Sequence, residues 1–237
     1  MTHRVSVRHN IYMKELRIPT YGSSLHYSGE SGAKYLAWQD AQGEINGKIN
    51  AKKFKEFNFR DSVVLDFGAG TGNLLQNIDA KKKIAVEINQ DAHELIIKRG
   101  IVAQSQLEEI PSGTIDFVIS NHALEHVPFP IQALREIYRT LKPGGLLILV
   151  VPIDDWRNQR RYDSKDINHH LNTWTPLLLG NSLNEAGFSV DRNSIEVLTH
   201  AWFPGYRKLH RLPGFDIACY IYAILRRRRQ LMAKIRK

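Results

Sequence analysis

The chain has 237 residues, of which 43% are hydrophobic and 24% are charged. These are ordinary proportions for a globular protein, and they exclude a disordered or a fibrous chain. The single cysteine, Cys219, cannot form an internal disulfide, which favours a reducing compartment. The first residues lack the apolar stretch of a secretory signal, and no apolar run reaches the roughly 18 residues of a membrane-spanning helix. We therefore expect a cytoplasmic protein.

The net charge is concentrated at one end of the chain. Residues 201–237 hold ten basic residues and one acidic residue, so this segment accounts for the whole formal charge of +9. Residues 1–200 hold 23 basic and 23 acidic residues and are electrically neutral. A strongly basic protein often binds nucleic acid, but here only a terminal segment is basic, so the charge does not indicate nucleic-acid binding by the body of the protein.

In chain order, the sequence divides into three segments. Residues 1–61 carry several aromatic side chains, and we expect them to form a helical cover rather than an independent domain. Residues 62–200 alternate short β-rich runs with stretches of helical spacing, a pattern typical of a parallel α/β sheet. Residues 201–237 form a basic C-terminal segment.

The alternating segment predicts a three-layer α/β sandwich around a mostly parallel sheet of seven strands. Apolar runs such as LLILVV favour strands that are buried on both faces. The expected strands cover residues 62–67, 83–87, 101–104, 114–120, 145–151, 188–190 and 194–199. The expected helices cover residues 72–78, 90–99, 130–141 and 173–186.

A glycine-rich turn follows the first predicted strand. In VVLDFGAGTGNLL the strand ends near Asp66, and Gly68, Gly70 and Gly72 lead into a helix. Glycines let the backbone approach a ligand because no Cβ stands in the way. A dinucleotide-binding turn would have its third glycine at position 73, which is Asn73 here. A carboxylate at Asp66 would repel a pyrophosphate but would suit a ligand that bears an ammonium group.

Further motifs lie at the ends of later strands. IAVEIN places Glu87 at the end of the second strand, 19 residues after Gly68, where a carboxylate can accept hydrogen bonds from both hydroxyls of a ribose. DFVISNHALEHV places Asn121 and His122 just beyond the fourth strand. LKPGG supplies a helix stop before the fifth strand.

Together these motifs resemble those of the class I S-adenosylmethionine-dependent methyltransferases, and in particular their small-molecule branch, over roughly residues 62–190. The resemblance implies a Rossmann-like methyltransferase sheet and S-adenosyl-L-methionine as the cofactor. The glycines would line the methionine and the ribose, and Asp66 would lie near the methionine amino group. The implied cofactor site consists of Asp66, Gly68, Ala69, Gly70, Gly72, Glu87, Ile88, Gln106 and Asn121.

The resemblance also implies individual contacts. Glu87 would hold the ribose, Ile88 would pack on the adenine, and Asn121 would lie below the methionine through its backbone. Gln106 stands where family members often have an acid for the adenine amino group, and its amide oxygen could accept the same hydrogen bond. For Glu87 the alternative is a solvated strand end, and for Gly72 it is a helix-packing role.

Histidines are the expected catalytic residues. A base is useful when a hydroxyl attacks the methyl group, because its proton must leave as the bond forms. His122 and His126 lie four residues apart and could share one face of a helical turn, although His126 could instead pack structurally against the next helix. HHLNTWTP resembles a loop of methyltransferases associated with bacterial surface polysaccharides. That resemblance implies that His170 binds or deprotonates a sugar hydroxyl.

The sequence assigns no metal site. Four aspartates and two histidines share one loop, and some sugar methyltransferases use magnesium to acidify a hydroxyl, so a magnesium site is an alternative. The spacing of these residues is not diagnostic, and acidic loops are usually solvated. The loop residues are Asp154, Asp155, Asp163, Asp166, His169 and His170.

The C-terminal segment predicts an amphipathic helix over residues 217–236, with apolar residues at spacings of three and four around Arg226–Arg229. Its apolar part is too short to span a bilayer, but the helix could lie peripherally on an anionic membrane at the inner face. Docking on the domain or on a second subunit is an equal alternative. RNA binding is less favoured because few aromatic residues alternate with the basic ones.

The sequence therefore predicts an S-adenosylmethionine-dependent methyltransferase, with O-methylation of a sugar or of a lipid-linked glycan as the expected reaction. One alternative is an RNA or protein methyltransferase that is anchored by the basic segment. Another is a non-catalytic binding module with the cofactor fold, which the intact Asp66 and Glu87 argue against.

Overall fold

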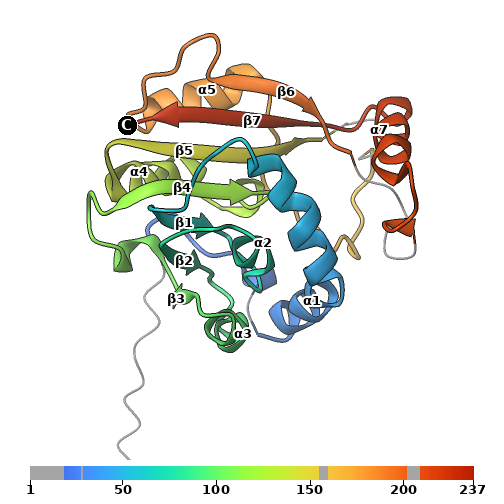
Figure 1. The fold of residues 1–237 in the computed structure, drawn as a ribbon, viewed down its shortest axis with the longest axis horizontal. Coiled ribbons are helices and arrows are strands. Elements are labelled where there is room, and N and C mark those ends of the chain that lie inside the picture. The colour runs from blue at the N-terminus through green and yellow to red at the C-terminus, as the bar shows by residue number, and fades with distance from the viewer. Residues whose placement is uncertain (1–18, 28, 155–159, 202–208) are drawn as a thin grey trace, which may run out of the picture.

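The computed structural model describes residues 19–27, 29–154, 160–201 and 209–237. Its centre is a seven-stranded sheet with the order β3-β2-β1-β4-β5-β7-β6 (Figure 1). The strands are β1 (Val63–Phe67), β2 (Lys82–Val86), β3 (Val102–Gln104), β4 (Ile115–Asn121), β5 (Leu141–Ile153), β6 (Ile195–Thr199) and β7 (Arg229–Arg236). β1 to β5 pair in parallel, whereas β7 is antiparallel to both β5 and β6. This is the mostly parallel seven-stranded sheet that the sequence predicts.

Helices cover both faces of this sheet. The helices are α1 (Gly29–Ala51), α2 (Asn73–Gln76), α3 (His93–Lys98), α4 (Pro130–Thr140), α5 (Pro176–Glu185) and α7 (Phe215–Leu225). α4 and α5 pack on one face, and α2 and α3 pack on the other. Figure 1 shows α1 and α7 beside the carboxyl ends of the parallel strands. Short 3₁₀ turns cover Leu25–Tyr27, Lys52–Phe54, Gln90–Ala92, Leu107–Glu109 and Leu124–His126.

β5 joins the two halves of the core. Its side chains alternate between the two faces of the sheet, because successive Cβ atoms of a strand point in opposite directions. Leu147 and Leu149 pack with α4 and α5, whereas Ile148 and Val150 pack with α2 and α3. All four side chains are fully buried, which explains why this strand is apolar without alternation.

α1 lies close to the turn that follows β1. Gly43 and Gly47 stand one helical turn apart and face Asn73, and a Cβ on either glycine would collide with that residue. The two glycines therefore allow a close approach of α1 to α2. As a consequence, Tyr35 and Gln39 of α1 lie over the carboxyl ends of the central strands, where both line the cavities described below.

The helix predicted over residues 217–236 is present only as far as Leu225, where α7 ends, and the prediction is wrong beyond that residue. The chain turns at Arg226–Arg228, and the following residues form β7 in the interior of the sheet. Leu231 and Ile235 fit a helical spacing, but Leu231, Met232 and Ala233 are consecutive and buried on both faces. Pairing with β5 on one side and β6 on the other therefore outweighs the helical pattern.

Two smaller expectations also need correction. Because β7 belongs to the sheet, the expected domain boundary at residue 200 does not enclose the whole sheet. Residues 188–190 form no strand, because the N–H of Phe188 closes the end of α5 through the carbonyl of Leu183, and the Phe188 ring packs edge-on against Tyr138. Among the described helices, none combines the length and the apolar character needed to cross a bilayer.

Candidate active site

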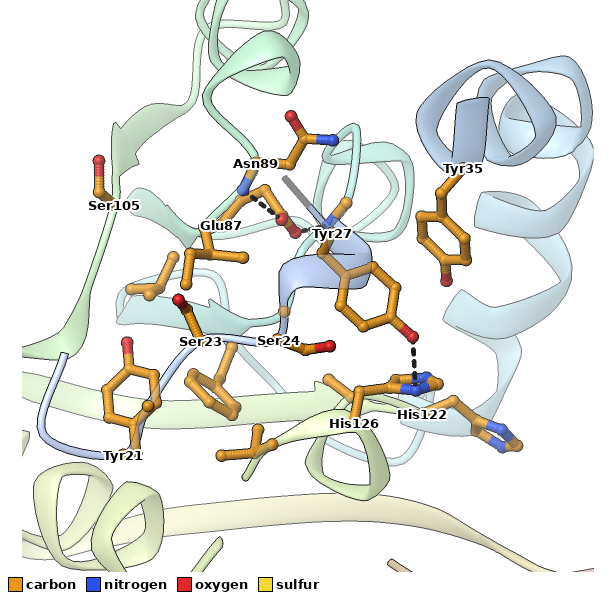
Figure 2. A pocket seen from close by; sticks show the side chains of 18 of the residues that line it. Tyr21, Ser23, Ser24, Tyr27, Tyr35, Glu87, Asn89, Ser105, His122 and His126 are labelled. Atoms are coloured by element: carbon orange, nitrogen blue, oxygen red, sulfur yellow. Dashed lines mark hydrogen bonds between the residues drawn. The ribbon is translucent and has the colours of Figure 1, made fainter. Parts of the chain in front are cut away.

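A cavity of about 130 Å³ lies at the carboxyl ends of β1, β2 and β4. Its wall combines the glycine turn after β1, the end of β2, the turn after β4, and residues of the N-terminal cover. Figure 2 shows Tyr27 and Tyr35 from the cover, Glu87 from the end of β2 and His126 from the turn after β4 around this space. Open α/β sheets bind ligands beyond the carboxyl ends of their strands, so this cavity lies where a cofactor is expected.

The glycine turn requires glycine at two positions that line the cavity. Gly68 has φ +74° and Gly70 has φ +54°, a region that favours glycine. A Cβ on Gly68 would collide with Ala123, and a Cβ on Gly70 would collide with the side chain of Gln39. Gly72 instead directly precedes α2, has Ile96 and Ile101 beside it, and does not line the cavity.

Glu87 is held in place by the backbone. Oε2 accepts a hydrogen bond from the N–H of Gly70 at 2.8 Å, and Oε1 accepts one from the N–H of Asn89 at 2.9 Å. Burial raises the pKa of Glu87, and these backbone donors oppose that shift. Glu87 is therefore not a solvated strand end, since its carboxylate is fixed at the wall of the cavity.

Asp66 and Ala69 lie behind the glycine turn. Asp66 is 2% exposed, and both residues line a separate cavity of about 110 Å³ under α1. Burial, with a smaller contribution from the charge of Glu87, raises the pKa of Asp66 well above its usual value. Gln39 reaches both cavities, and its buried Oε1 has no hydrogen-bond donor among the described residues.

The far end of the cavity differs from the sequence prediction by one residue. Ile88 and Ser105 line this cavity, whereas Gln106 does not. Tyr21 and Phe67 add an aromatic wall, with their ring centroids 5.6 Å apart. Gln106 is extended at the beginning of the 3₁₀ turn Leu107–Glu109, so the preceding residue takes the position that faces the cavity.

A second cavity of about 680 Å³ adjoins the first. It lies between α1, α7, β7 and the segment around residue 170. The residues that line both cavities are Tyr35, Gln39, Asn121, His122 and His126. A cofactor in the smaller cavity would therefore face an acceptor in the larger one.

Of the three predicted catalytic histidines, His122 and His126 lie at this boundary, and His170 lines the larger cavity beside them. His126 and His170 lie with their ring centroids 5.0 Å apart, and His122 donates from Nε2 to Oε1 of Gln230 at 3.1 Å. His122 has φ +56° and lies in a turn, so it does not share a helical face with His126 in the way its spacing predicts. The segment around His170 is held against the turn after β4, because the side-chain amide of Asn172 donates to the carbonyl of Val127 at 2.8 Å.

Glu125, which the sequence analysis did not single out, lies between these histidines. Its side chain is 0% exposed, with Oε1 3.8 Å from Nδ1 of His122 and 3.7 Å from Nε2 of His126. Burial raises the pKa of Glu125 to about 8. Glu125 belongs to the LEHV motif, and that motif was the signal that could have identified it.

The pKa values of the imidazoles in the site shift in different directions. Burial lowers the pKa of His126 to about 4 and that of His200 to about 3, and it lowers the pKa of His122 well below its usual value. Burial also opposes protonation of His170, but Asp154 accepts a hydrogen bond from Nδ1 at 2.8 Å and raises the pKa of His170 overall. His170 is thus oriented by a carboxylate, as a histidine that handles a proton needs to be.

Lys53 is a further residue that the sequence did not indicate. It extends from the turn after α1 into the larger cavity and donates to Oδ1 of Asn121 at 2.8 Å and to Oε1 of Gln230 at 3.2 Å. Burial lowers the pKa of Lys53 to about 7. Lys53, Tyr27 and Tyr35 come from a helical cover without a recognisable motif, so no signal in the sequence could have found them.

Among its described residues, the acidic loop considered for magnesium forms no cluster of carboxylates that could hold an ion. Asp163 accepts from the N–H of Lys165, and Asp166 accepts from the N–H groups of Asn168 and His169, so these carboxylates cap their own loop. Asp155 lies outside the described residues.

The basic segment borders the larger cavity, which Arg228 lines. Arg226–Arg229 line a further cavity of about 320 Å³ together with Asp154, His170 and His200. Arg226, Arg227 and Arg229 are exposed, and Arg228 is half-buried. The positive charge therefore lies next to the candidate catalytic residues.

Comparison with known proteins gives the family. A family model described as a methyltransferase domain matches residues 38–193. The chain belongs to this methyltransferase family.

The chain resembles, among others, the following curated relative and two solved structures. The chloroplastic 2-methyl-6-phytyl-1,4-hydroquinone methyltransferase of Spinacia oleracea is 29% identical over 111 residues, which cover 41% of this chain and 32% of that protein. This chain thus matches about a third of that relative's length. A SAM-dependent methyltransferase from Archaeoglobus fulgidus aligns with a TM-score of 0.60 and 16% identity over 86% of this chain and 99% of its own. A SAM-dependent methyltransferase from Thermotoga maritima is described as a possible histamine N-methyltransferase. It aligns with a TM-score of 0.55 and 23% identity over 70% of this chain and 79% of its own.

These comparisons confirm the class I methyltransferase fold that the sequence predicts. S-adenosylmethionine, the predicted cofactor, is the cofactor of this fold in both structural relatives. The acceptor is a separate question, because the fold alone hosts many acceptors.

Proposed function

We propose that this chain transfers the methyl group of S-adenosylmethionine to a hydroxyl oxygen of an acceptor in the larger cavity. The observation that carries this proposal is the boundary shared by the two cavities, which is lined by Asn121, His122 and His126. A cofactor in the smaller cavity presents its methyl group toward this boundary. The histidines and Glu125 then lie where an acceptor hydroxyl must approach.

The smaller cavity offers matching groups for each part of the cofactor. Glu87 accepts the ribose hydroxyls, while Ile88 and Ser105 border the adenine. The glycine turn admits the ribose and the methionine at close range. Oε1 of Gln39 has no donor among the described residues and would accept from the methionine ammonium group, with Asp66 supplying negative charge behind it.

The chemistry requires alignment more than activation. The acceptor oxygen forms a bond to the methyl carbon while the carbon–sulfur bond breaks, and the sulfur keeps the electron pair as S-adenosylhomocysteine leaves. The hydroxyl proton passes to a base or to solvent. His170, oriented by Asp154, is placed to hold this hydroxyl, and the closed walls exclude water from competing.

A sugar hydroxyl of a lipid-linked glycan is the acceptor class that we favour. α7 buries Phe215 and Cys219 against the domain but leaves an apolar outer face, with Ile221 and Leu225 52% and 77% exposed. Exposed arginines follow this face directly. An apolar surface flanked by cations suits an anionic membrane, where a lipid-linked acceptor would be found.

A hydroquinone is the second candidate acceptor. It is favoured by the name of the Spinacia oleracea relative, which specifies a phytyl-bearing hydroquinone. Both candidate acceptors present a hydroxyl group next to a hydrocarbon tail. They differ in the ring that must fit between α1 and α7.

The test is a methyl-transfer assay with S-adenosylmethionine labelled at the methyl group. Lipid-linked glycans, a prenylated hydroquinone, RNA and a total protein extract serve as parallel acceptors, and mass spectrometry locates the added methyl group. We expect transfer to oxygen of the glycan. Transfer to the hydroquinone alone would establish the second candidate, and transfer to RNA or protein would contradict both.

A further inference from the structure

Glu125 carries a carboxylate for which the described part of the chain provides no hydrogen-bond donor. The side chain is completely buried, yet neither Oε1 nor Oε2 accepts a hydrogen bond from any described residue. Its backbone carbonyl, in contrast, accepts from the N–H groups of Leu171 and Asn172 at 2.9 and 3.0 Å, so the residue itself is firmly placed. Buried polar groups in folded proteins are nearly always satisfied, so an orphaned carboxylate indicates a missing proton or a missing cation.

The nearest nitrogen of His126 offers a lone pair rather than a proton. Tyr27 must donate its hydroxyl proton to the backbone carbonyl of Asn168, 2.8 Å away, because a carbonyl only accepts. The 2.7 Å contact between Tyr27 and Nδ1 of His126 is then donated by the imidazole. Nε2 of the neutral ring is therefore unprotonated, and it lies 3.7 Å from Oε1 of Glu125.

His170 is fixed in the same way. Oδ2 of Asp154 accepts from Nδ1 of His170 at 2.8 Å, which leaves Nε2 as the free nitrogen of the ring. One potential ligand atom from each of Glu125, His126 and His170 lies within 4.8 Å of the other two. Three potential metal-ligand atoms thus converge from two separate segments of the chain.

We propose that Glu125, His126 and His170 bind a divalent transition-metal ion, with Asp154 as the positioning residue that orients His170. Two imidazoles and one carboxylate favour Zn²⁺ over Mg²⁺, which prefers oxygen ligands in octahedral geometry. Catalytic zinc sites have three protein ligands of these types and leave one position open. This site differs from the acidic loop, since Asp163 and Asp166 are not part of it.

The role of the ion rests on the proposed function. The open position faces the larger cavity, which Glu125, His126 and His170 all line. An acceptor hydroxyl that occupies it loses its proton to solvent more readily, and the oxygen then displaces S-adenosylhomocysteine from the methyl carbon. In this arrangement His170 acts as a ligand and not as the base.

Calorimetric titration of ZnCl₂ into the untagged, chelator-treated full chain tests the inference. We expect one ion per chain, and a loss of affinity of at least about a hundredfold in Glu125→Gln and in His170→Asn. Asp154→Asn should weaken binding by roughly 10- to 100-fold, because partners that orient a ligand have effects of this size. His200→Asn is the matched control: its ring lies in the same cavity but outside the cluster, so it should bind as the wild type does.

Co²⁺ provides a spectroscopic readout. Visible absorption bands on titration, absent in Glu125→Gln, would support direct ligation by this cluster. The absence of a one-to-one event in the wild type with either ion, or equal affinity in the wild type, Glu125→Gln and His170→Asn, would overturn the inference. Circular dichroism verifies folding, and His170→Asn provides the test if Glu125→Gln does not fold.

The two proposals fail separately. A chain that binds zinc at this cluster but methylates no hydroxyl acceptor leaves the metal site in place and refutes the proposed function. Conversely, undiminished methyl transfer by a chain that binds no zinc refutes the metal site and leaves the proposed function intact.

Discussion

His126 and Lys53 face the same cavity and are both largely neutral near physiological pH. Burial lowers the pKa of His126 to about 4 and that of Lys53 to about 7, whereas it raises the pKa of Glu125 to about 8. His170 differs because Asp154 raises its pKa despite its burial. At the residue scale, burial therefore sets the direction of these pKa shifts, and the hydrogen bond to Asp154 reverses that direction at His170.

A substitution at His170 tests its part in catalysis. His170→Ala should lower turnover by roughly a hundredfold or more, because it removes the group that holds the acceptor hydroxyl. Affinity for S-adenosylhomocysteine should not change, since His170 does not line the cofactor cavity. His200→Ala is the control in the same cavity. If His170→Ala left turnover unchanged and His122→Ala lowered it about a hundredfold, the residue that holds the acceptor hydroxyl would be in the turn after β4.

The lowered pKa of Lys53 predicts unusual reactivity. An amine with a pKa of about 7 is mostly unprotonated at about pH 8, whereas an ordinary lysine with a pKa near 10.4 is protonated there. An amine-acylating reagent should therefore modify Lys53 faster than exposed Lys55, and the rate should fall as the pH decreases below about 7. Peptide mass spectrometry measures both rates. Equal rates in the folded chain would contradict the prediction.

The residues that sequence analysis found are those that follow a strand end at fixed spacing. Gly68, Gly70 and Glu87 meet this condition and line the smaller cavity. Lys53 and Tyr27 could not be found, because a helical cover reaches the site through tertiary packing and not through a local pattern. The sequence pointed to Gln106, but its neighbour Ser105 lines the smaller cavity. The conformation of the short turn decides which of these two residues faces the cavity, and the sequence does not reveal that conformation.

At the element scale, β7 is the clearest departure from the sequence prediction. Apolar residues at spacings of three and four fit a helix, but the same residues fit a central strand with two apolar faces. Periodicity cannot separate these cases in short apolar runs. These residues form a strand because β7 pairs with β5 along its whole length. The local sequence contains no information about that partner strand.

A pair of leucines tests this assignment. Leu231→Ala should destabilise the protein by about 2–5 kcal/mol, because Leu231 is fully buried in β7 and its loss leaves a cavity. Leu225→Ala, at the 77% exposed end of α7, should change stability by less than about 0.5 kcal/mol. Urea unfolding measures both. A small effect of Leu231→Ala would contradict its place in the sheet.

The turn between α7 and β7 is the element proposed to contact a membrane. Replacing Arg226, Arg227 and Arg229 with glutamine removes up to about 3 kcal/mol of attraction to an anionic surface. Sedimentation with anionic vesicles should fall, and wild-type binding should weaken as salt rises. Activity on a soluble acceptor fragment should survive.

A control variant with the same loss of charge shows whether the position of the arginines or the net charge of the protein determines membrane binding. Glutamine at Arg60, Lys81 and Lys82 removes the same charge at the amino ends of the strands, away from α7, and should leave sedimentation unchanged. Equal sedimentation of the wild type and the three-arginine variant at every salt concentration would show that this turn is not a membrane contact. Its arginines would then belong to a subunit interface or to RNA.

At the scale of the whole molecule, the sheet brings the site together from distant parts of the chain. The glycine turn, Glu87 and the LEHV segment reach one edge because parallel strands end on the same side. α1 borders both cavities at this edge, and α7 with the residues around His170 borders the larger one. The fold and the cofactor half could be predicted because their motifs are local. The acceptor half could not, because it is assembled from segments without motifs.

Calorimetric titration with S-adenosylhomocysteine tests the central claim most directly, using the wild type, Gly70→Val and Gly113→Val. Both glycines have positive φ, +54° and +65°, so valine strains the backbone similarly at each. Gly113 has open space around it and lies outside the smaller cavity, whereas Gly70 lines that cavity and a Cβ there would meet the side chain of Gln39. We expect one-to-one binding by the wild type and Gly113→Val and none by Gly70→Val. Unchanged affinity in Gly70→Val, or no binding by the wild type, would contradict the central claim.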